Sequence, residues 1–589
     1  MVRLGRALRT APPPLGLGQP RSQEAGPRTW PIRGLSSFPS RRMLPGDYLP
    51  RLALLLLAAR LPQACPVGCD CFKGELVCAS EDLADVPPDI PENATEIIFV
   101  ETPLPTLRPR AFANASCLSK VVFLNCGLRS LQAEAFGGLP ALEDLEVTGS
   151  PLGGLPGEAF RNLSGLRKLT LNFNRLQVLP EELFRGLDSL EALHLQGNQL
   201  QRLPAAIFQP LGALRLLNLA QNLLGQISER LLAPLASLQT LKLSDNALAT
   251  LPPRAFWGLG GLRELFLDGN ALTELPEGLF SGLGALEKLW LQHNAIGHLP
   301  AAIFSPLANL TFLNLQGNRL RALPDGLFRQ TPSLTRLSLA GNGLENISGD
   351  AFANTPKLSV LTLSHNGLAG LPPGLFDHVP GLAKLYLAGN NLTALDGRLF
   401  RNLSELELLS LANNLLTSLP QGIFEENFKL FNLGLHGNPW RCDCHLSYLL
   451  DWLREYSDRH FNLQTYCASP QYLAGQLLPA LEAEQLVCPV PPGPHGGRAF
   501  LEAAEEPSSG WDLVEEARAP ARCTYSSSDG TVVLACDREV CRWLRVQLSP
   551  RQTSTSPDLT LNSTREWVLE SSCGSVSVTL SINALGGGG

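Results

Sequence analysis

Residues 166–180 have the sequence LRKLTLNFNRLQVLP, and this stretch decides the fold. Its asparagine, Asn174, recurs at a constant interval of 24 residues, and leucines keep the same distances from each copy. The same frame continues backwards through Ser150, Cys126 and Thr102, which gives fifteen repeats in register. A fixed period of this length predicts a repeat architecture in which each unit packs against its neighbours. We call the recurring residues the ladder asparagines: Asn174, Asn198, Asn222, Asn246, Asn270, Asn294, Asn318, Asn342, Asn366, Asn390, Asn414 and Asn438.

The spacing within one repeat predicts its local structure. Leu169 and Leu171 alternate with other residues, which predicts a short strand with one buried face. We expect the amide of Asn174 to bond the backbone of a neighbouring turn and so to satisfy groups that would otherwise be unpaired. Leu176 and Phe184 then return the chain along the opposite side. Stacked repeats predict a parallel β-sheet roughly 70 Å long on the concave surface.

This frame is the leucine-rich repeat signature, and a phenylalanine ten residues after most of the ladder asparagines, with Leu232 in its place once, resembles the extracellular class. The resemblance implies an α/β-type solenoid: a leucine-rich-repeat horseshoe with a concave parallel β-sheet, which we place at residues 94–437. Burial of the apolar side chains of one repeat contributes about 10–20 kcal/mol. Ordering its backbone costs roughly 24–48 kcal/mol. A single repeat therefore cannot fold alone, and its neighbours must share their cores.

The first 64 residues differ in composition from the rest of the chain. Residues 1–42 contain eight Arg and one acidic residue, and we interpret them as an upstream extension absent from the mature protein. Met43 precedes the apolar run 52–59 and a small residue, Ala64, so residues 43–64 are interpreted as a secretory signal peptide. A mitochondrial transit peptide is the alternative, and the cysteines that follow favour secretion.

Composition and motifs exclude several functions. A net charge of −7 with no basic stripe indicates no nucleic-acid partner. After Cys65 no apolar run is long enough to span a bilayer, and the C-terminus has no hydrophobic tail for a lipid anchor, so we expect no membrane anchor. Sequence motifs of zinc proteases, serine hydrolases and phosphate-binding loops are absent, and the nine histidines are dispersed. We therefore expect neither a cofactor nor catalytic residues, and the chain is predicted not to be an enzyme.

Cysteines cluster at both ends of the repeats, where a repeat stack needs its apolar core covered. These clusters, at residues 65–93 and 438–488, resemble the flanking modules of extracellular leucine-rich-repeat proteins. Spacing alone does not determine connectivity. The resemblance implies disulfides joining Cys65 to Cys71, Cys69 to Cys78, Cys442 to Cys467, and Cys444 to Cys488. A zinc site is the alternative for four residues of the second cluster: Cys442, Cys444, His445 and Cys467.

The remaining cysteines fall into two groups. Cys117 and Cys126 flank a predicted strand and lie too far apart for a disulfide, so Cys126 is predicted to be a buried thiol at a ladder position. For Cys117 a free thiol and a disulfide with another chain are the two alternatives. Residues 489–510 have the composition of a linker. Residues 511–589 are predicted to form a small β-rich module, with strands near 531–534, 542–548 and 576–582. Two disulfides of unspecified pairing would stabilise it, formed by Cys523, Cys536, Cys541 and Cys573.

The concave surface is the predicted site of partner binding. Between the two strand leucines of each repeat, one side chain points outward. Phe266 and Trp290 occupy this position in adjacent repeats, Phe312 lies beside them on the next strand, and Tyr386 lies further along the column. Exposed aromatic residues of this kind are typical of protein-binding hot spots. The alternative is that the rings only cover the sheet. An acidic group on one predicted strand is interpreted as a solvated face rather than a cation site: Glu143, Asp144 and Glu146.

Eight sequons for N-glycosylation occur, and none of them coincides with a ladder asparagine. Three of them share one position in the repeat, in the loop after the phenylalanine. Glycans at several of these turns would make the surface away from the sheet more soluble. The candidate sites are Asn93, Asn114, Asn162, Asn309, Asn346, Asn391, Asn402 and Asn562.

Stretches outside the repeat frame resemble the large, non-catalytic regulatory subunits of carboxypeptidase N, a family of secreted leucine-rich-repeat proteins. They are residues 97–102, 142–150, 437–440, 523–536 and 541–544. The resemblance implies a glycosylated plasma protein that binds and stabilises the zinc carboxypeptidase catalytic subunit in a hetero-oligomer with two copies of each subunit. The alternatives are a secreted leucine-rich-repeat carrier of a growth-factor complex and a soluble receptor-like ectodomain.

Overall fold

The computed structural model describes residues 65–456 and 464–488, and the backbone of four strands between 523 and 571. The predicted extension at 1–42, the signal peptide at 43–64 and the linker at 489–510 lie outside the described residues. None of the helices in the described part is long and apolar enough to cross a bilayer.

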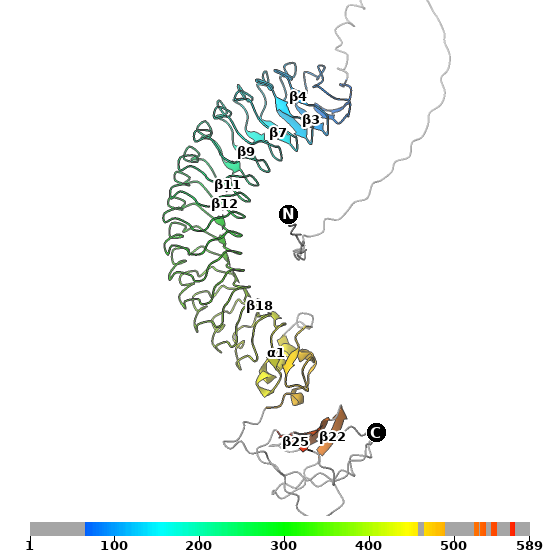
Figure 1. Cartoon of the computed structure of the whole chain (residues 1–589), viewed down its shortest axis with the longest axis vertical. Coiled ribbons are helices and arrows are strands. Elements are labelled where there is room, and N and C mark those ends of the chain that lie inside the picture. Colours follow the sequence, from blue (N-terminus) through cyan, green and yellow to red (C-terminus); the bar gives the residue numbers. More distant parts are fainter. Residues whose placement is uncertain are drawn as a thin grey trace, which may run out of the picture. The chain divides into compact units, whose positions relative to one another are not determined.

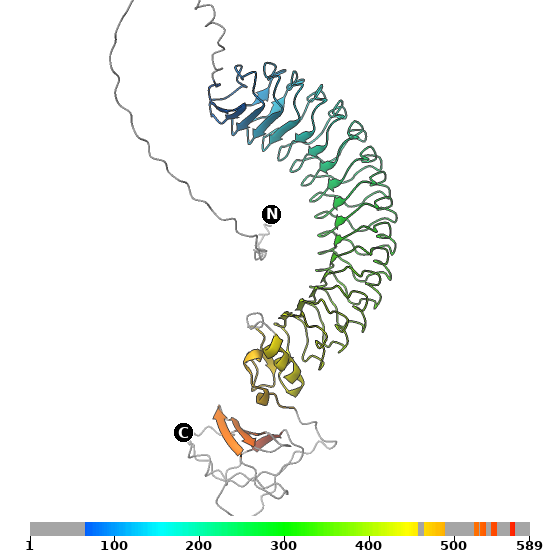
Figure 2. The same ribbon diagram turned by 180° about the vertical axis from the view of Figure 1, so that it is seen from behind.

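The repeats form one arc with their strands on the inner side (Figure 1), and Figure 2 shows the same arrangement from behind. A 17-stranded sheet contains β1 (Cys69–Phe72), β2 (Glu75–Cys78) and one strand from each of the fifteen repeats. The repeat strands are β3 (Glu96–Val100), β5 (Lys120–Leu124), β7 (Asp144–Thr148), β8 (Lys168–Thr170), β9 (Ala192–His194), β10 (Leu216–Asn218), β11 (Thr240–Lys242), β12 (Glu264–Phe266), β13 (Lys288–Trp290), β14 (Phe312–Asn314), β15 (Arg336–Ser338), β16 (Val360–Thr362), β17 (Lys384–Tyr386), β18 (Leu408–Ser410) and β19 (Asn432–Gly434). The predicted horseshoe with a concave parallel sheet is confirmed.

The register of the sheet follows directly from the 24-residue period. Neighbouring repeat strands are parallel, and Leu217 of β10 lies opposite Leu241 of β11, which lies opposite Leu265 of β12. These leucines are fully buried. Behind them the repeat phenylalanines stack with ring centroids 6.1 Å apart at Phe304 and Phe328. Identical positions of successive repeats thus share one continuous core, as a solenoid requires.

The ladder asparagines connect each repeat to its neighbour. Asn294 donates from Nδ2 to the carbonyl of Leu267, 3.0 Å away in the preceding repeat, and to that of Leu291 at 3.1 Å. Its Oδ1 accepts the N–H of Leu272 at 3.0 Å. Each amide therefore satisfies backbone groups that would otherwise be buried without partners. In the early repeats Cys126 takes this position, and its sulfur accepts the hydroxyl of Thr102 at 3.2 Å.

The residue before each ladder position has a left-handed backbone conformation. Phe173 has φ of 53° and Gly197 has φ of 70°, and the pattern continues at His293 with 57° and Gly317 with 67°. Glycine adopts this conformation without steric cost, and other residues do so at a cost of roughly 1–2 kcal/mol. The spacing of leucines and asparagines does not predict this column of left-handed residues.

Both ends of the stack are covered. The β1–β2 hairpin adds to the sheet through β2, which pairs in parallel with β3, and disulfides join Cys65 to Cys71 and Cys69 to Cys78. A second, smaller sheet lies beside the early repeats and pairs β4 (Thr106–Leu107) with β6 (Ser130–Leu131).

The C-terminal cover is built around Trp440, which is fully buried and donates its indole N–H to the carbonyl of Leu435 at 2.9 Å. Trp452 of the covering helix packs 5.2 Å from Phe424, the last ring of the phenylalanine stack. Disulfides join Cys442 to Cys467 and Cys444 to Cys488. The elements are β20 (Trp440–Arg441), η1 (Cys444–Leu446), α1 (Ser447–Tyr456), β21 (Cys467–Ser469), η2 (Leu478–Ala480) and η3 (Ala483–Gln485).

The four disulfides join the same pairs that the family resemblance implies. Cys117 is exposed, Cys126 is buried, and neither forms a disulfide, which agrees with the distance argument.

The C-terminal residues contain an antiparallel sheet of four strands in chain order. Two of the expected strands are found, at 531–536 and 543–549, and the expected strand at 576–582 lies outside the described residues. The backbone register places Cys523 opposite Cys536. The strands are β22 (Cys523–Ser528), β23 (Thr531–Cys536), β24 (Trp543–Ser549) and β25 (Glu566–Ser571).

Candidate protein-binding surface

Three aromatic side chains from neighbouring strands meet on the concave sheet. The rings of Phe266 and Trp290 stack with centroids 3.8 Å apart and planes inclined by 7°. Phe312 lies 5.1 Å from Trp290 at an angle of 43°. All three are partly exposed. We call these residues the aromatic cluster; their close packing presents a rigid apolar surface of the kind that anchors protein interfaces.

A cation extends this cluster by one strand. The ammonium of Lys242 on β11 lies 5.1 Å from the ring centroid of Phe266, within the range of a cation–π interaction. The repeat pattern of the sequence does not predict this contact. Tyr386 lies on β17, separated from β14 by β15 and β16, so the structure does not bring it to the aromatic cluster.

Ion pairs run along the strand starts on the same face. Lys288 Nζ lies 2.9 Å from Glu264 Oε1 beside the aromatic cluster, and this hydrogen bond raises the pKa of Lys288. Lys120 and Glu96 form a pair of the same kind at 3.0 Å, which raises the pKa of Lys120. These contacts hold the flanking charges in place across neighbouring strands.

Neighbouring side chains contact the acidic residues Glu143, Asp144 and Glu146. Asp144 pairs with Lys168 at 3.2 Å, and Glu146 accepts the hydroxyl of Thr148 at 2.9 Å. Glu143 lies 3.8 Å from Arg167. Because protein groups already contact these carboxylates, their arrangement agrees with a solvated, ion-paired face.

The imidazole of His194 lies on β9 of the concave sheet and is partly buried. Burial lowers its pKa, and the ammonium groups of Lys168 and Lys242 lower it further. The carboxylates of Glu146 and Asp144 act in the opposite direction. The neutral form of His194 is therefore favoured in the folded protein.

A polar hollow of about 810 Å³ lies at the edge of the sheet where the strands begin. Arg167, Arg215, Gln239 and Arg263 line it, each immediately preceding a repeat strand. No sequence motif marks these residues, although alignment of the repeats on the ladder asparagines places them in one column.

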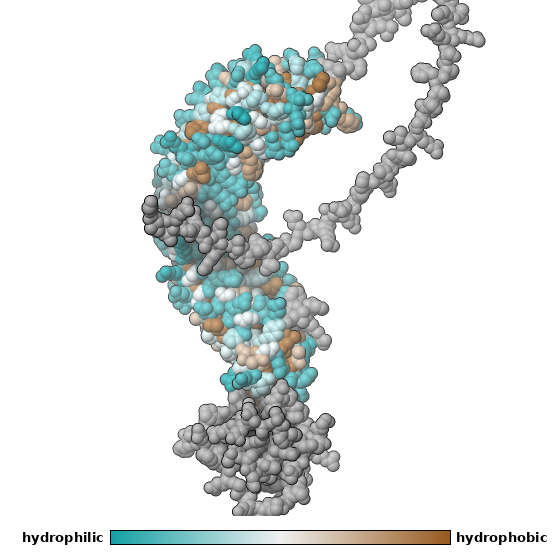
Figure 3. All heavy atoms as spheres, turned by 45° about the vertical axis from the view of Figure 1, so that its right-hand side comes forward, coloured by the Kyte–Doolittle hydropathy of each residue, from teal (hydrophilic) through white to brown (hydrophobic). Residues whose placement is uncertain are grey.

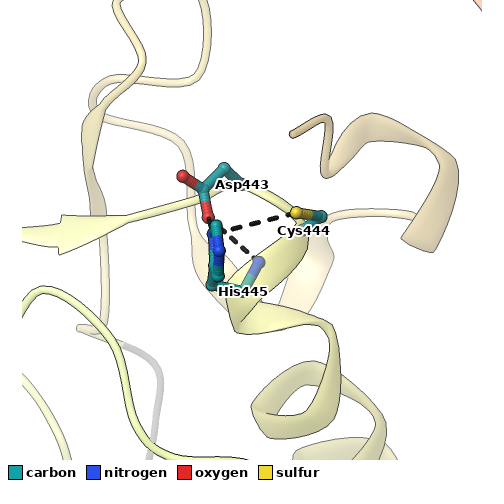
Figure 4. A group of neighbouring side chains, drawn as sticks. All are labelled: Asp443, Cys444 and His445. Carbon is teal, nitrogen blue, oxygen red and sulfur yellow. Dashed lines mark hydrogen bonds and ion pairs between the residues drawn. The ribbon is translucent and has the colours of Figure 1, made fainter. Parts of the chain in front are cut away.

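The residues considered for a zinc site have structural roles. Asp443, Cys444 and His445 lie close together (Figure 4), and Asp443 Oδ1 accepts the backbone N–H of His445 at 3.0 Å. This contact caps the 3₁₀-helix η1. Cys444 and Cys442 are both in disulfides. Since thiolates are the sulfur ligands of zinc, the donor set does not fit the metal.

Seven of the eight sequon asparagines lie in the described residues, and all seven are exposed. Asn162 and Asn402 follow their ladder positions by twelve residues, whereas Asn391 directly follows Asn390 and Asn346 follows Asn342 by four residues. Asn562 lies outside the described residues. Figure 3 shows one face of the repeats, which is mostly hydrophilic with hydrophobic residues scattered across it.

The sequence matches the leucine-rich repeat family in overlapping segments from 116–176 to 380–439. It is 57% identical to human carboxypeptidase N subunit 2 over 163 residues, which is 28% of this chain and 30% of that protein. The mouse protein of the same name is 55% identical over 159 residues, 27% of this chain and 29% of that protein. The matched segment thus spans about three tenths of these relatives, and the resemblance to carboxypeptidase N regulatory subunits is confirmed there.

Solved structures agree with the fold. The TLR13–ssRNA13 complex superposes with a TM-score of 0.60 at 27% identity, over 66% of this chain and 57% of that chain. The Drosophila Toll–Spatzle complex superposes with a TM-score of 0.61 at 23% identity, over 70% of this chain and 61% of that chain. This second comparison supports a shared fold only. The repeat period, the ladder asparagines and the family match lead to one conclusion: the chain belongs to the leucine-rich repeat family.

Proposed function

We propose that this chain is the non-catalytic regulatory subunit of a carboxypeptidase N assembly. In this role it is a secreted plasma glycoprotein that binds the zinc carboxypeptidase catalytic subunit and stabilises it, with two copies of each subunit. The observation that carries the proposal is the 57% identity to human carboxypeptidase N subunit 2. The stretches outside the repeat frame support it, because many secreted repeat proteins share the leucine frame alone.

The aromatic cluster supplies the central contact in this proposal. Phe266 and Trp290 are stacked on adjacent strands, so little side-chain entropy is lost when a partner covers them. Lys242 and the ion pair of Lys288 with Glu264 form a polar rim around the rings. An apolar centre with a charged rim is the usual anatomy of a specific protein interface.

Stabilisation of the partner follows from binding alone. A protein that binds the folded form of the carboxypeptidase and not its unfolded form shifts the unfolding equilibrium of that enzyme toward the folded state. Regulation of this kind requires no reacting group on the repeat protein. The chain is accordingly proposed to be non-catalytic.

Co-expression tests the proposal. The full chain, secreted together with the catalytic subunit of carboxypeptidase N, is expected to co-purify with it and to prolong its activity at body temperature. The catalytic subunit alone is the control. Separate elution of the two proteins at micromolar concentration, with no change in enzyme half-life, would contradict the proposal; capture of a growth-factor complex would favour the carrier alternative.

A further inference from the structure

An ordered column of side chains follows the edge where the repeat strands begin. Each member donates its backbone N–H to the carbonyl of the member 24 residues earlier: Gln239 to Arg215 at 2.8 Å, and Arg263 to Gln239 at 2.8 Å. Successive members are therefore adjacent in space. We call this set the edge column; it consists of Glu143, Arg167, Glu191, Arg215, Gln239, Arg263 and Glu287.

Charges in the edge column alternate in sign, with one exception. Arg167 lies between Glu143, at 3.8 Å, and Glu191, at 3.2 Å. Arg215 lies 3.7 Å from Glu191. The next member in the alternation would be an acid, and the chain has Gln239 there instead.

The alternation resumes after this neutral position. Arg263 pairs with Glu287 at 2.7 Å, on the side away from Gln239. Arg215 and Arg263 thus flank a residue that carries no charge. Their side chains are 62% and 60% exposed, so both guanidinium groups remain accessible to a partner.

The neutral position lies in the hollow of about 810 Å³, which small residues such as Ala213, Ser237 and Gly261 help to line. No sequon occurs between Asn162 and Asn309, so an N-linked glycan cannot be attached to the repeats that form this hollow. The aromatic cluster begins in the same repeats, because Arg263 directly precedes β12 with Phe266. A partner that covers the cluster can therefore reach the hollow.

We propose that the hollow binds an acidic side chain of the carboxypeptidase subunit, whose carboxylate occupies the space between Arg215 and Arg263. The inference rests on the proposed function and specifies its contact. The bound carboxylate completes the alternation of the edge column, and two arginines can each donate charge-assisted hydrogen bonds to it. Pairs at exposed sites contribute modestly, so we expect this contact to adjust affinity and orientation while the aromatic cluster anchors the partner.

The charge test is Gln239→Glu, which places a carboxylate of this chain in the neutral position. That carboxylate pairs with Arg215 and Arg263 and repels the acid of the partner. We expect affinity for the catalytic subunit to fall about tenfold, with an unchanged or higher melting temperature. The matched control is Gln226→Glu, which adds the same charge at an exposed position just after ladder residue Asn222. Its affinity is expected to equal that of the wild type.

A steric test uses an added glycan. Gly282→Asn combined with Gly284→Ser reproduces the natural sequon Asn402-Leu403-Ser404 at the same repeat position, shortly before Ala285, which lines the hollow. A Cβ at either glycine meets no atom within 4 Å, and the natural sequon residue Asn162 has the same left-handed conformation as Gly282. Binding is expected to be lost. The control is His378→Asn with Pro380→Ser, at the same repeat position away from the hollow, and it is expected to bind normally.

The outcomes separate this inference from the proposed function. Weaker binding by both test variants and normal binding by both controls supports the acidic contact. If the glycan variant loses binding and Gln239→Glu does not, the partner covers the hollow without placing an acidic side chain in it. That result would overturn the inference. Wild-type affinity in both test variants would overturn it too and leave the proposed function intact. A wild-type chain that does not bind the catalytic subunit would end both.

Discussion

The imidazole of His293 lies over Gly317, in the space that a side chain there would need. A Cβ built on Gly317 would lie 2.7 Å from Nδ1 of His293, and both residues have positive φ. The same relationship joins His365 to Gly389, where the distance is 2.6 Å. At these two places a histidine in the left-handed column is thus accommodated by a glycine in the following repeat.

This packing predicts that Gly317→Ala destabilises the protein by about 2 kcal/mol or more, because the new methyl group meets His293 in a left-handed conformation. The change in denaturation midpoint, followed by circular dichroism, measures the effect. Gly297→Ala is the control, since its Cβ meets no atom within 4 Å and its φ is not positive. In a double variant that combines Gly317→Ala with His293→Gly, part of the stability lost in Gly317→Ala should be recovered. Additive changes in stability would contradict the contact between His293 and residue 317.

Removal of one ladder amide is predicted to destabilise the repeats strongly. Asn294→Ala leaves the N–H of Leu272 and the carbonyls of Leu267 and Leu291 without their partner, at a cost of about 3 kcal/mol. Urea denaturation measures the shift. Gln209→Ala, at an exposed position, should have little effect. Equal midpoints for the two variants would show that the ladder is dispensable.

The aromatic cluster is predicted to anchor the partner. Trp290→Ala removes the ring that stacks between Phe266 and Phe312, and affinity for the carboxypeptidase subunit should fall at least about tenfold. Surface plasmon resonance measures the change. Trp257→Ala removes a tryptophan that is 64% exposed and lies outside the cluster, so it should bind as the wild type does. An unchanged affinity for Trp290→Ala would refute the anchoring role.

The lowered pKa of His194 predicts a contribution to the pH dependence of stability. Above its ordinary pKa of about 6.5, His194 is neutral in both states and contributes nothing. As the pH falls below that value, the unfolded chain takes up a proton that the folded protein resists, so stability falls.

The urea midpoint of His194→Gln should therefore fall less than that of the wild type when the pH is lowered from about 7.5 to about 5. His298→Gln, at an exposed imidazole, is the control and should retain the loss seen in the wild type. If the urea midpoint falls by the same amount in His194→Gln and in the wild type, the pH dependence comes from other groups.

The C-terminal disulfides are predicted to hold the cover on the last repeat. Cys444 and Cys488 are 44 residues apart, and the loop-closure model gives their bond about 4 kcal/mol. Replacing both by serine should lower the melting temperature and expose Trp440, which its red-shifted fluorescence would reveal. Cys117→Ser, at an exposed free thiol, is the control. Unchanged fluorescence at elevated temperature would contradict this role.

Much of the fold could be predicted because one residue type specifies one environment in every repeat. Leucines at 24-residue intervals define the buried face, and Asn294 is recognisable from sequence because its amide serves the same backbone groups as the other ladder asparagines. The stack of Phe266 on Trp290 follows from the register. Tyr386 shares their column but lies several strands away, so column membership alone does not make a cluster.

Other features depend on contacts between repeats that no single repeat shows. His293 and Gly317 occupy equivalent positions, and only the structure shows that one side chain lies over the other. The edge column depends on pairs such as Arg263 with Glu287, 24 residues apart, whose significance appears when their backbones are seen to be adjacent. Sequence gives the identities of these side chains and leaves their contacts undetermined.

The constant register has a consequence for how such a chain can change in evolution. Every junction between repeats is equivalent, as Leu217 opposite Leu241 and Leu241 opposite Leu265 illustrate. Duplication or loss of one complete 24-residue unit restores the same interfaces on either side, whereas an insertion of one residue within a repeat strand moves the side chains that follow it in that strand to the opposite face. The gene can therefore lengthen or shorten its product in whole units, and the span between the two covers is open to selection.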